Sequence, residues 1–244
     1  MPESAASPQT YSDSQAWLSV ASILVGDCDW HGWLETGEQQ LEELALQSDR
    51  VLGNGRGAAR AVAFISAADT HSGVWRINRH GGLFGKLQAD RYVDATRLQQ
   101  EVSLSAELRT HGIDTPEVLL AFAKRHGAWW RQHLVTREVE SACTVFDARE
   151  SVAALRAATC LLQQLFDVGL WATDLHPGNL LWQPDSERCW LIDLAGAELR
   201  RAPLTRAERQ ARVERFARFF VKHAGAEPVG MAELRHSLCG EGKE

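Results

Sequence analysis

The sequence predicts an α+β protein of two lobes, a small β-rich N-terminal lobe with one helix and a mainly helical C-terminal lobe. Short apolar segments separated by glycine-rich or polar turns occupy residues 50–77 and 116–139, which is the pattern of β-strands. Between them, residues 96–111 place apolar side chains at helical spacing. Two longer helical repeats follow at 150–168 and 205–223, and these three observations together indicate the fold class.

Length and composition are those of one globular catalytic unit. With 244 residues, the chain can bury one sizeable core but has little room for a further domain. Its net charge of −6 predicts no general attraction to nucleic acid. The five scattered cysteines show no metal-ligand spacing, which favours a reducing compartment, and the longest apolar run, Trp17 to Val25, is too short to span a bilayer. We therefore expect a cytoplasmic protein.

Two lobes between two tails are expected along the chain. Residues 1–14 are rich in Ser, Pro, Gln and Thr and lack periodicity, so they are expected to form a mobile tail. The N-terminal lobe is expected to span residues 15–140, and the C-terminal lobe residues 141–223. A second tail is expected at 224–244.

The N-terminal lobe begins with a clear glycine signal. Gly53-Asn54-Gly55-Arg56-Gly57 is followed by the apolar segment 61–65, which indicates strand, glycine loop and strand. A polar turn then leads to Val74-Trp75-Arg76-Ile77, whose alternation predicts a third strand that pairs with the second. The helix at 96–111 ends at Gly112. Two further strands are predicted at 118–122 and 133–139.

The C-terminal lobe is expected to contain two helices and a hairpin. The first helix spans about residues 150–168. Apolar strands at 180–182 and 190–192 bracket the turn Pro184-Asp185-Ser186-Glu187, which is a hairpin signal. The tract 205–223 places a valine and three phenylalanines on one face and arginines elsewhere, which predicts an amphipathic helix.

A polar motif lies beside this hairpin. Asp174 and Asn179 are separated by four residues, and Asp193 follows the second strand. Phosphoryl transfer needs a carboxylate that orients the hydroxyl nucleophile and hard oxygen ligands that hold Mg²⁺ against the phosphates. Asp174 is the candidate for the first task, and Asn179 and Asp193, at facing ends of adjacent strands, for the second. The alternative is a surface loop whose polar residues only cap turns, and the joint spacing disfavours it.

The order of these residues resembles that of protein kinases, in which a catalytic-loop Asp and Asn precede the Asp of a D-F-G motif. Two positions depart from that pattern: Ala172 stands where kinases usually have His, and Asp193-Leu194-Ala195 replaces D-F-G. Upstream, Gly55-Arg56-Gly57 lies between the first two strands, where a kinase has the glycine loop that covers the nucleotide phosphates. A simple hairpin turn is the alternative for this loop.

Kinases also pair a Lys on the third strand with a helix Glu. Here the candidate strand carries Arg76, which is always charged and binds phosphate in a bidentate manner, and the next helix carries Glu101 as its expected partner. The alternative is that both are ordinary surface ions. The resemblance implies that the N-terminal lobe binds ATP, that Mg²⁺ is the cofactor, and that the C-terminal lobe holds the catalytic Asp174.

A basic segment with two adjacent glycines distinguishes between kinase-like families. The segment from Arg76 to Leu87 is similar to the stretch that bacterial Kdo (3-deoxy-D-manno-octulosonic acid) kinases carry after their third strand. The loop 174–181 also resembles that of aminoglycoside and choline phosphotransferases, so the loop alone does not select a substrate. The resemblance to the lipopolysaccharide Kdo kinases covers about residues 50–222. It implies transfer of the γ-phosphate of ATP to a hydroxyl of a Kdo sugar on a lipid A precursor, at the inner face of the cytoplasmic membrane, in lipopolysaccharide core biosynthesis.

Basic side chains around the double glycine are candidate ligands of the acceptor. A Kdo acceptor is anionic, and a cationic rim can hold its carboxylate or phosphate groups. The candidates are Arg79, His80, Lys86 and Arg91, with Arg76 beside them. The alternative is a solvated basic loop on an acidic protein.

A run of arginines between residues 200 and 218 can attract an anionic membrane surface, so peripheral contact with the inner membrane is a further expectation. The favoured alternative is a solvated helix face in which Glu208 pairs with Arg212 and Glu214 with Arg218.

Among functions, two alternatives to the Kdo kinase stay open. One is a small-molecule phosphotransferase of the aminoglycoside or choline kinase type, and the other is a catalytically inactive kinase fold that binds a partner.

Overall fold

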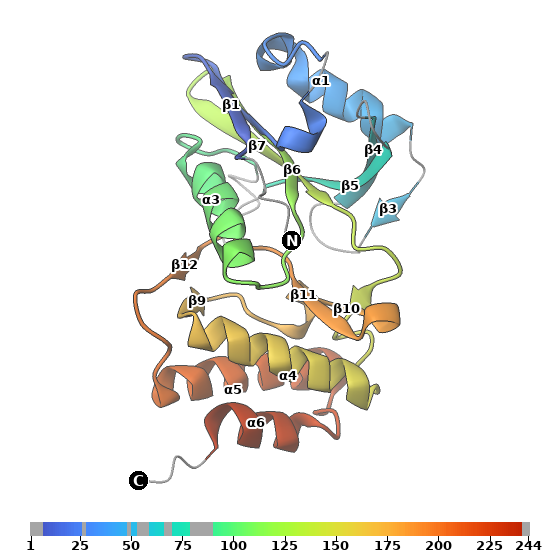
Figure 1. Cartoon of the computed structure of the whole chain (residues 1–244), viewed down its shortest axis with the longest axis vertical. Helices are drawn as coiled ribbons and strands as arrows, with labels where there is room; N and C mark the ends of the chain where they lie inside the picture. Colours follow the sequence, from blue (N-terminus) through green and yellow to red (C-terminus); the bar gives the residue numbers. More distant parts are fainter. Residues whose placement is uncertain are drawn as a thin grey trace. The chain divides into compact units, whose positions relative to one another are not determined.

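The computed structural model describes residues 7–25, 28–47, 50–52, 59–65, 70–78 and 90–240. It divides into two compact units (Figure 1). Unit 1 comprises Met1–Val102 and Glu117–Glu138, and unit 2 comprises Ser103–Pro116 and Val139–Glu244. The expected α+β class, with a β-rich first unit and a mainly helical second unit, is confirmed. The expectation of one helix in the β-rich part is wrong, because a helix at Gly32–Leu46 packs on the sheet in addition to the predicted one, which is Thr96–Thr110. The expected single boundary at residue 140 does not describe this division, because unit 1 ends at Glu138 and the earlier segment Ser103–Pro116 belongs to unit 2.

Unit 1 is built on an antiparallel sheet, which the described residues form in the order β1-β2-β6-β7-β5-β4-β3. The strands are β1 Gln9–Ser12, β2 Ala16–Val20, β3 Val51–Leu52, β4 Ala59–Ile65, β5 Thr70–Ile77, β6 Val118–His126 and β7 Trp129–Arg137. The predicted pairing of the third glycine-loop strand with the second is confirmed, because β5 pairs with β4 from Arg60↔Trp75 to Ile65↔Thr70. The two later strands of the lobe are confirmed as β6 and β7.

The tail expected at residues 1–14 is wrong for residues 9–12, which form β1. Its polar side chains give no strand periodicity, but its backbone pairs with β2 from Gln9↔Val20 to Ser12↔Trp17. Strand β2 in turn pairs with β6 and buries Leu18 completely. The first half of the apolar run from Trp17 is therefore a strand, and a short 3₁₀ turn, Ser22–Leu24, follows it.

Two helices cover opposite faces of this sheet (Figure 1). Helix α1, Gly32–Leu46, packs Trp33, Leu34 and Leu41 against one face, together with Leu120 and Phe122 of β6. The alternate β6 residues, Ala121 and Ala123, face the first half of helix α3, Thr96–Thr110. Because successive side chains of a strand point to opposite faces, β6 is buried on both sides and reads as an uninterrupted apolar run. Its position at the centre of unit 1 follows from this pattern.

Unit 2 is organised around helix α4, Val152–Asp167, whose N-terminus is capped by the Ser151 side chain. Its other helices are α5 Arg206–Ala224 and α6 Met231–Cys239, and its strands are β8 Cys143–Thr144, β9 Leu170–Ala172, β10 Leu180–Gln183, β11 Arg188–Leu191 and β12 Ala197–Leu199. The predicted helices at 150–168 and 205–223 and the hairpin β10–β11 are confirmed. Gly169 ends the α4 turn at φ +85°, where a Cβ atom would lie 2.4 Å from the Ala202 carbonyl oxygen, so only glycine fits.

The tail expected from residue 224 is also wrong, because residues 231–239 form α6. Its apolar residues Met231, Leu234 and Leu238 follow at spacings of three and four and are buried against α4 and α5. Because polar residues surround this short apolar stripe, the sequence pattern does not predict the helix. Arg235 joins α6 to the rest of unit 2 through ion pairs with Glu214 and Glu227.

The glutamates of α5 do not form the pairs that the sequence suggested. Glu208 forms a capping box with Thr205 and an ion pair with Arg200, while Glu214 pairs with Arg235. Both glutamates therefore contact residues outside their own helix, and tertiary packing replaces the expected i, i+4 pattern.

No helix in the described part of the chain combines the length and the apolar character needed to cross a bilayer.

Candidate active site

The β10–β11 hairpin brings Asn179 and Asp193 to the same end of unit 2. Leu180 pairs with Leu191, and the Ile192 amide donates to the Asn179 carbonyl oxygen at 2.9 Å. Asn179 therefore directly precedes β10, and Asp193 follows the partner strand by two residues. This is the arrangement that the spacing of the sequence motif predicts.

Asp193 adopts a backbone conformation that is uncommon for a residue with a side chain, at φ +63°. Asp tolerates this left-handed region better than most residues because its short polar side chain can bond locally. Here its Oδ1 accepts a hydrogen bond from the Ala195 amide at 3.3 Å. The chain thus turns sharply at the point where the motif requires an oxygen ligand.

Asp174 lies on the loop between β9 and β10, and its side chain is 60% exposed. The Asn179 side chain holds this loop, since its Nδ2 donates to the Asp174 carbonyl oxygen at 2.9 Å. That bond uses the amide nitrogen of Asn179, and the Oδ1 atom is the acceptor of the same amide group. The loop therefore leaves the Asp174 carboxylate accessible and fixes its main chain.

Helix α5 supports the same loop with three side chains that the sequence prediction did not connect to it. Arg215 Nη2 donates to Asp174 Oδ1 at 3.0 Å, and Arg212 Nη1 donates to the Ala172 carbonyl oxygen at 3.2 Å. Phe219 stacks on the His176 ring with a centroid distance of 4.3 Å and an interplanar angle of 8°. From the sequence alone, these arginines indicate only a solvated or membrane-facing helix surface.

His176 is a neutral structural part of this loop. Its Nδ1 accepts a hydrogen bond from the Gly178 amide at 3.1 Å, which requires the unprotonated nitrogen. Burial is the largest cause that lowers the pKa of His176, and the positive charge of Arg215 lowers it further. The carboxylates of Asp174 and Asp193 act in the opposite direction, but the net shift is downward. A Cβ atom on Gly178 would lie 3.1 Å from the His176 ring, so glycine allows this close approach.

In unit 1, Arg76 and Glu101 form the ion pair expected from the sequence. The Arg76 side chain is 26% exposed, whereas that of Glu101 is 3% exposed. Two buried residues extend the contact. Asn78 accepts from Arg76 at 2.9 Å and donates to Glu101 at 3.4 Å and to Gln132 at 3.3 Å. Such a buried pair needs these hydrogen bonds to offset its desolvation.

The sequence prediction missed Asn78 and Gln132. Asn78 directly follows β5, and Gln132 lies on the neighbouring strand β7. Their amides were not part of any motif, and only the strand pairing places them beside Arg76. Gln132 lies in the polar run Arg131-Gln132-His133, so the sequence pattern gives no sign that its side chain is fully buried.

The remaining predicted residues are less fully described. Gly55, Arg56, Gly57, Arg79, His80 and Lys86 lie outside the described residues. Arg91 is exposed and precedes Tyr92, whose backbone bridges to that of Trp130. Within the described ranges, no group of three or more His, Cys, Asp or Glu side chains is placed to hold a metal ion. The predicted pair of metal ligands is one amide and one carboxylate.

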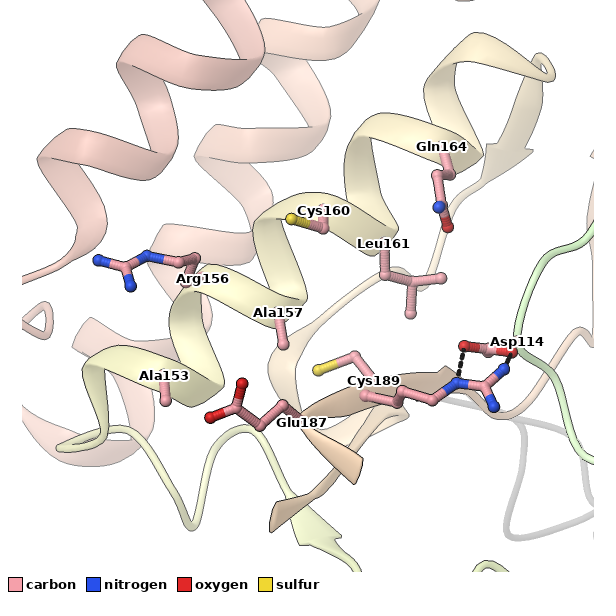
Figure 2. A pocket seen from close by; sticks show the side chains of 10 residues that line it. Asp114, Ala153, Arg156, Ala157, Cys160, Leu161, Gln164, Glu187 and Cys189 are labelled. Carbon is pink, nitrogen blue, oxygen red and sulfur yellow. Dashed lines mark hydrogen bonds and ion pairs between the residues drawn. The ribbon is translucent and has the colours of Figure 1, made fainter. Parts of the chain in front are cut away.

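A separate cavity of about 320 Å³ lies in unit 2 beside α4 and β11 (Figure 2). Its lining includes Arg156, Cys160 and Glu187, together with Arg188, which forms an ion pair with Asp114. None of the predicted site residues lines it. It is therefore not the place where the motif residues meet.

Similarity to known proteins decides the family. Residues 44–229 match the sequence model of the family described as "Lipopolysaccharide kinase (Kdo/WaaP) family", which is more than half of the chain. The chain belongs to this lipopolysaccharide kinase family. Family membership confirms the prediction of an ATP-dependent phosphotransferase, since the family is one of kinases.

Curated relatives carry the same activity in their names. The chain is 28% identical over 206 residues to a 3-deoxy-D-manno-octulosonic acid kinase of Photobacterium profundum, covering 81% of this chain and 85% of the relative. A protein of the same name from Vibrio cholerae is 30% identical over 165 residues, covering 62% and 66%. Among solved structures, "WaaP in complex with acyl carrier protein" is similar at 15% identity and a TM-score of 0.48, covering 91% of this chain and 97% of that one.

Proposed function

We propose that this lipopolysaccharide kinase transfers the γ-phosphate of ATP to a hydroxyl of a Kdo sugar on a lipid A precursor, in lipopolysaccharide core biosynthesis. The observation that carries the proposal is the exposed Asp174 carboxylate on a loop held by Asn179, at the end of the hairpin that also presents Asp193. The names of the curated relatives supply the acceptor.

Asp174 orients the acceptor hydroxyl and takes its proton. The hydroxyl oxygen forms a bond to the γ-phosphorus while the bond from that phosphorus to the β,γ-bridging oxygen breaks, and ADP leaves. Asn179 holds the loop at the Asp174 carbonyl group, and Arg212 holds the end of β9 at the Ala172 carbonyl group. The carboxylate therefore has a fixed base from which to meet the hydroxyl.

Asn179 and Asp193 fit a Mg²⁺ ion by the chemistry of their donor atoms. Mg²⁺ prefers hard oxygen ligands and takes few of them from the protein, with phosphate and water oxygens completing its shell. Asn179 uses its Nδ2 atom on the Asp174 carbonyl group, so its Oδ1 atom is the oxygen that would bind the ion. When bound, the ion would neutralise charge on the transferring phosphates.

Arg76 anchors the phosphates of ATP in place of the strand Lys of protein kinases. Glu101, Asn78 and Gln132 fix the direction of the Arg76 side chain through buried hydrogen bonds. A guanidinium group held in this way is a preorganised bidentate donor for phosphate oxygens. Gly55, Arg56 and Gly57 remain the predicted cover of the phosphates.

The acceptor determines where the enzyme works. A Kdo-bearing lipid A precursor is membrane-bound, so we propose a cytoplasmic location with peripheral contact to the inner membrane. Arg79, His80, Lys86 and Arg91 remain the predicted basic residues that face this anionic acceptor. A soluble amino alcohol would instead favour an acidic acceptor site.

An acceptor panel tests the proposal. The purified chain is incubated with Mg²⁺ and ATP and is offered a Kdo-bearing lipid A precursor beside soluble sugars and amino alcohols. We expect phosphate on the Kdo lipid alone. Transfer only to a soluble acceptor would identify a small-molecule phosphotransferase, and nucleotide binding without transfer to any acceptor would identify an inactive kinase fold.

A further inference from the structure

Helix α5 gathers positive charge beside the catalytic loop of an otherwise acidic protein. Arg212, Arg215 and Arg218 follow at intervals of three residues, which places them on one side of the helix. Partial burial and the charges of three neighbouring arginines lower the pKa of Arg212, so these guanidinium groups lie close enough to repel one another. The neighbours are Arg215, Arg200 and Arg218.

Some of these arginines are already engaged by ion pairs or by contacts that hold the backbone. Arg200 forms ion pairs with Glu198 and Glu208, which offset it. Arg212 stacks on Trp171 at 4.3 Å and donates to the Ala172 carbonyl oxygen, so its role is to secure the loop. Arg215 is different, because its contact is with the Asp174 carboxylate itself.

Arg215 has the accessibility that a ligand-binding residue needs. Its side chain is 45% exposed, and the bond from Nη2 to Asp174 Oδ1 at 3.0 Å uses one of its five N–H donors. An exposed ion pair of this kind adds little to stability. Arg212 bonds the end of the strand that leads into the loop, so the Arg215 contact is not the only support from α5.

An anionic acceptor that approaches Asp174 is repelled by the negative charges already there. A sugar acid that offers its hydroxyl to Asp174 brings a carboxylate toward another carboxylate and toward the phosphates of ATP. A guanidinium group beside Asp174 removes this penalty and can bind the carboxylate through two parallel N–H···O bonds. A sugar acid carries its carboxylate and its hydroxyls on the same ring, so one molecule can reach both residues.

We propose that Arg215 binds the carboxylate of a sugar-acid acceptor while Asp174 receives the proton of its hydroxyl. This inference rests on the proposed function and adds the residue that makes the enzyme select acidic over neutral sugars. Without acceptor, the Asp174 carboxylate is the anion that Arg215 contacts. With acceptor, the substrate carboxylate binds the N–H donors that Asp174 leaves unused.

Two matched acceptors test this assignment. One is a Kdo-bearing glycolipid, and the other is the same glycolipid with its sugar carboxylate converted to the methyl ester. The full chain, Arg215→Gln, Arg215→Lys and the control Arg201→Gln are compared by kcat/KM on both acceptors in neutral detergent micelles. Arg201 is exposed in the same unit and precedes α5, so its substitution removes an equal charge from outside this helix. Thermal unfolding midpoints verify that all variants fold.

We expect Arg215→Gln to lower kcat/KM on the free acid by about 10- to 100-fold and to change it little on the ester. Arg215→Lys should retain part of the preference, and Arg201→Gln all of it. Equal losses on both acceptors would overturn the inference, because Arg215 would then act only by positioning Asp174.

Two other outcomes also have a defined meaning. If the Arg215→Gln defect appears only with acceptor in vesicles that contain anionic lipid, Arg215 binds lipid headgroups and the inference fails. If the unsubstituted chain transfers phosphate to neither acceptor but does so to a soluble amino alcohol, the proposed function itself fails, and the inference fails with it.

Discussion

Asp193 has a left-handed backbone conformation and is the proposed carboxylate ligand of the metal ion. A residue at φ +63° is strained unless its side chain or its surroundings favour that conformation. The amide of Ala195 bonds the carboxylate and supports the turn. This conformation, at the end of the hairpin that holds Asn179, supports a role for Asp193 in binding the metal and nucleotide.

Substitution of Asp193 should weaken binding of the magnesium–nucleotide complex. We expect Asp193→Ala to raise the dissociation constant of Mg-ATP by at least about tenfold, since one charged oxygen ligand is lost. Asp193→Asn tests the charge while keeping a residue that tolerates the left-handed region. Titration calorimetry with and without Mg²⁺ provides the measurement.

Asp185 supplies the matched control, because it is exposed in the turn of the same hairpin. Asp185→Ala should bind Mg-ATP normally. Normal binding in both Asp193 variants would remove that residue from the metal site.

The Glu101 carboxylate orients Arg76, and its loss should change the KM for ATP more than it changes the stability of the protein. Glu101→Gln keeps the shape of the buried side chain but removes the charged partner of Arg76. A charge-assisted hydrogen bond contributes about 1.5 kcal/mol or more, so the KM for ATP should rise roughly tenfold. Glu107→Gln on the exposed side of the same helix is the control. An unchanged KM for ATP would make the Arg76–Glu101 pair purely structural.

Local spacing predicted some of these residues and tertiary contacts determined the others. Asp174, Asn179 and Asp193 could be found because a hairpin of short strands brings together residues close in the sequence. Arg215 is 41 residues from its partner Asp174, and Asn78 is 54 residues from Gln132. No sequence period connects such positions, so the sequence indicates only a general arginine surface and marks neither amide as part of a site.

At the scale of elements, strong periodicity identified α4, α5 and the β10–β11 hairpin. The two expected tails are wrong because they contain β1 and α6, short elements that gain their stability from neighbours. Strand β1 has mostly exposed side chains and depends on backbone pairing with β2. Helix α6 has nine residues, too few to form alone, and depends on burial against α4 and α5.

The burial of α6 predicts that it contributes to the stability of the protein. Leu234 is 1% exposed, so Leu234→Ala should lower the free energy of unfolding by about 2–5 kcal/mol through lost burial and a residual cavity. Glu233→Ala, at an exposed neighbouring position, should change it by less than about 0.5 kcal/mol. Urea unfolding measures both. Equal stability of the two variants would mean that residues after 224 behave as the tail that the sequence suggested.

At the scale of the molecule, each unit carries its own part of the proposed site. Unit 1 presents Arg76 on a network of buried amides, and unit 2 presents Asp174 and the candidate metal ligands. The sequence predicted the order of these parts and the α+β class. It could not predict the division of α3 between the units, because the helical repeat continues without change across residue 102.

The most direct test of the account is transfer of radiolabelled γ-phosphate to a Kdo-bearing lipid A precursor by the unsubstituted chain and by Asp174→Asn. The Asn side chain keeps the shape of Asp174, and the loop backbone remains held through the carbonyl oxygen of residue 174. We predict labelled Kdo lipid with the unsubstituted chain, a loss of about 10²- to 10⁴-fold in the variant, and nearly equal ATP affinity in both. Equal transfer by the two proteins would contradict the role of Asp174 and with it the proposed mechanism.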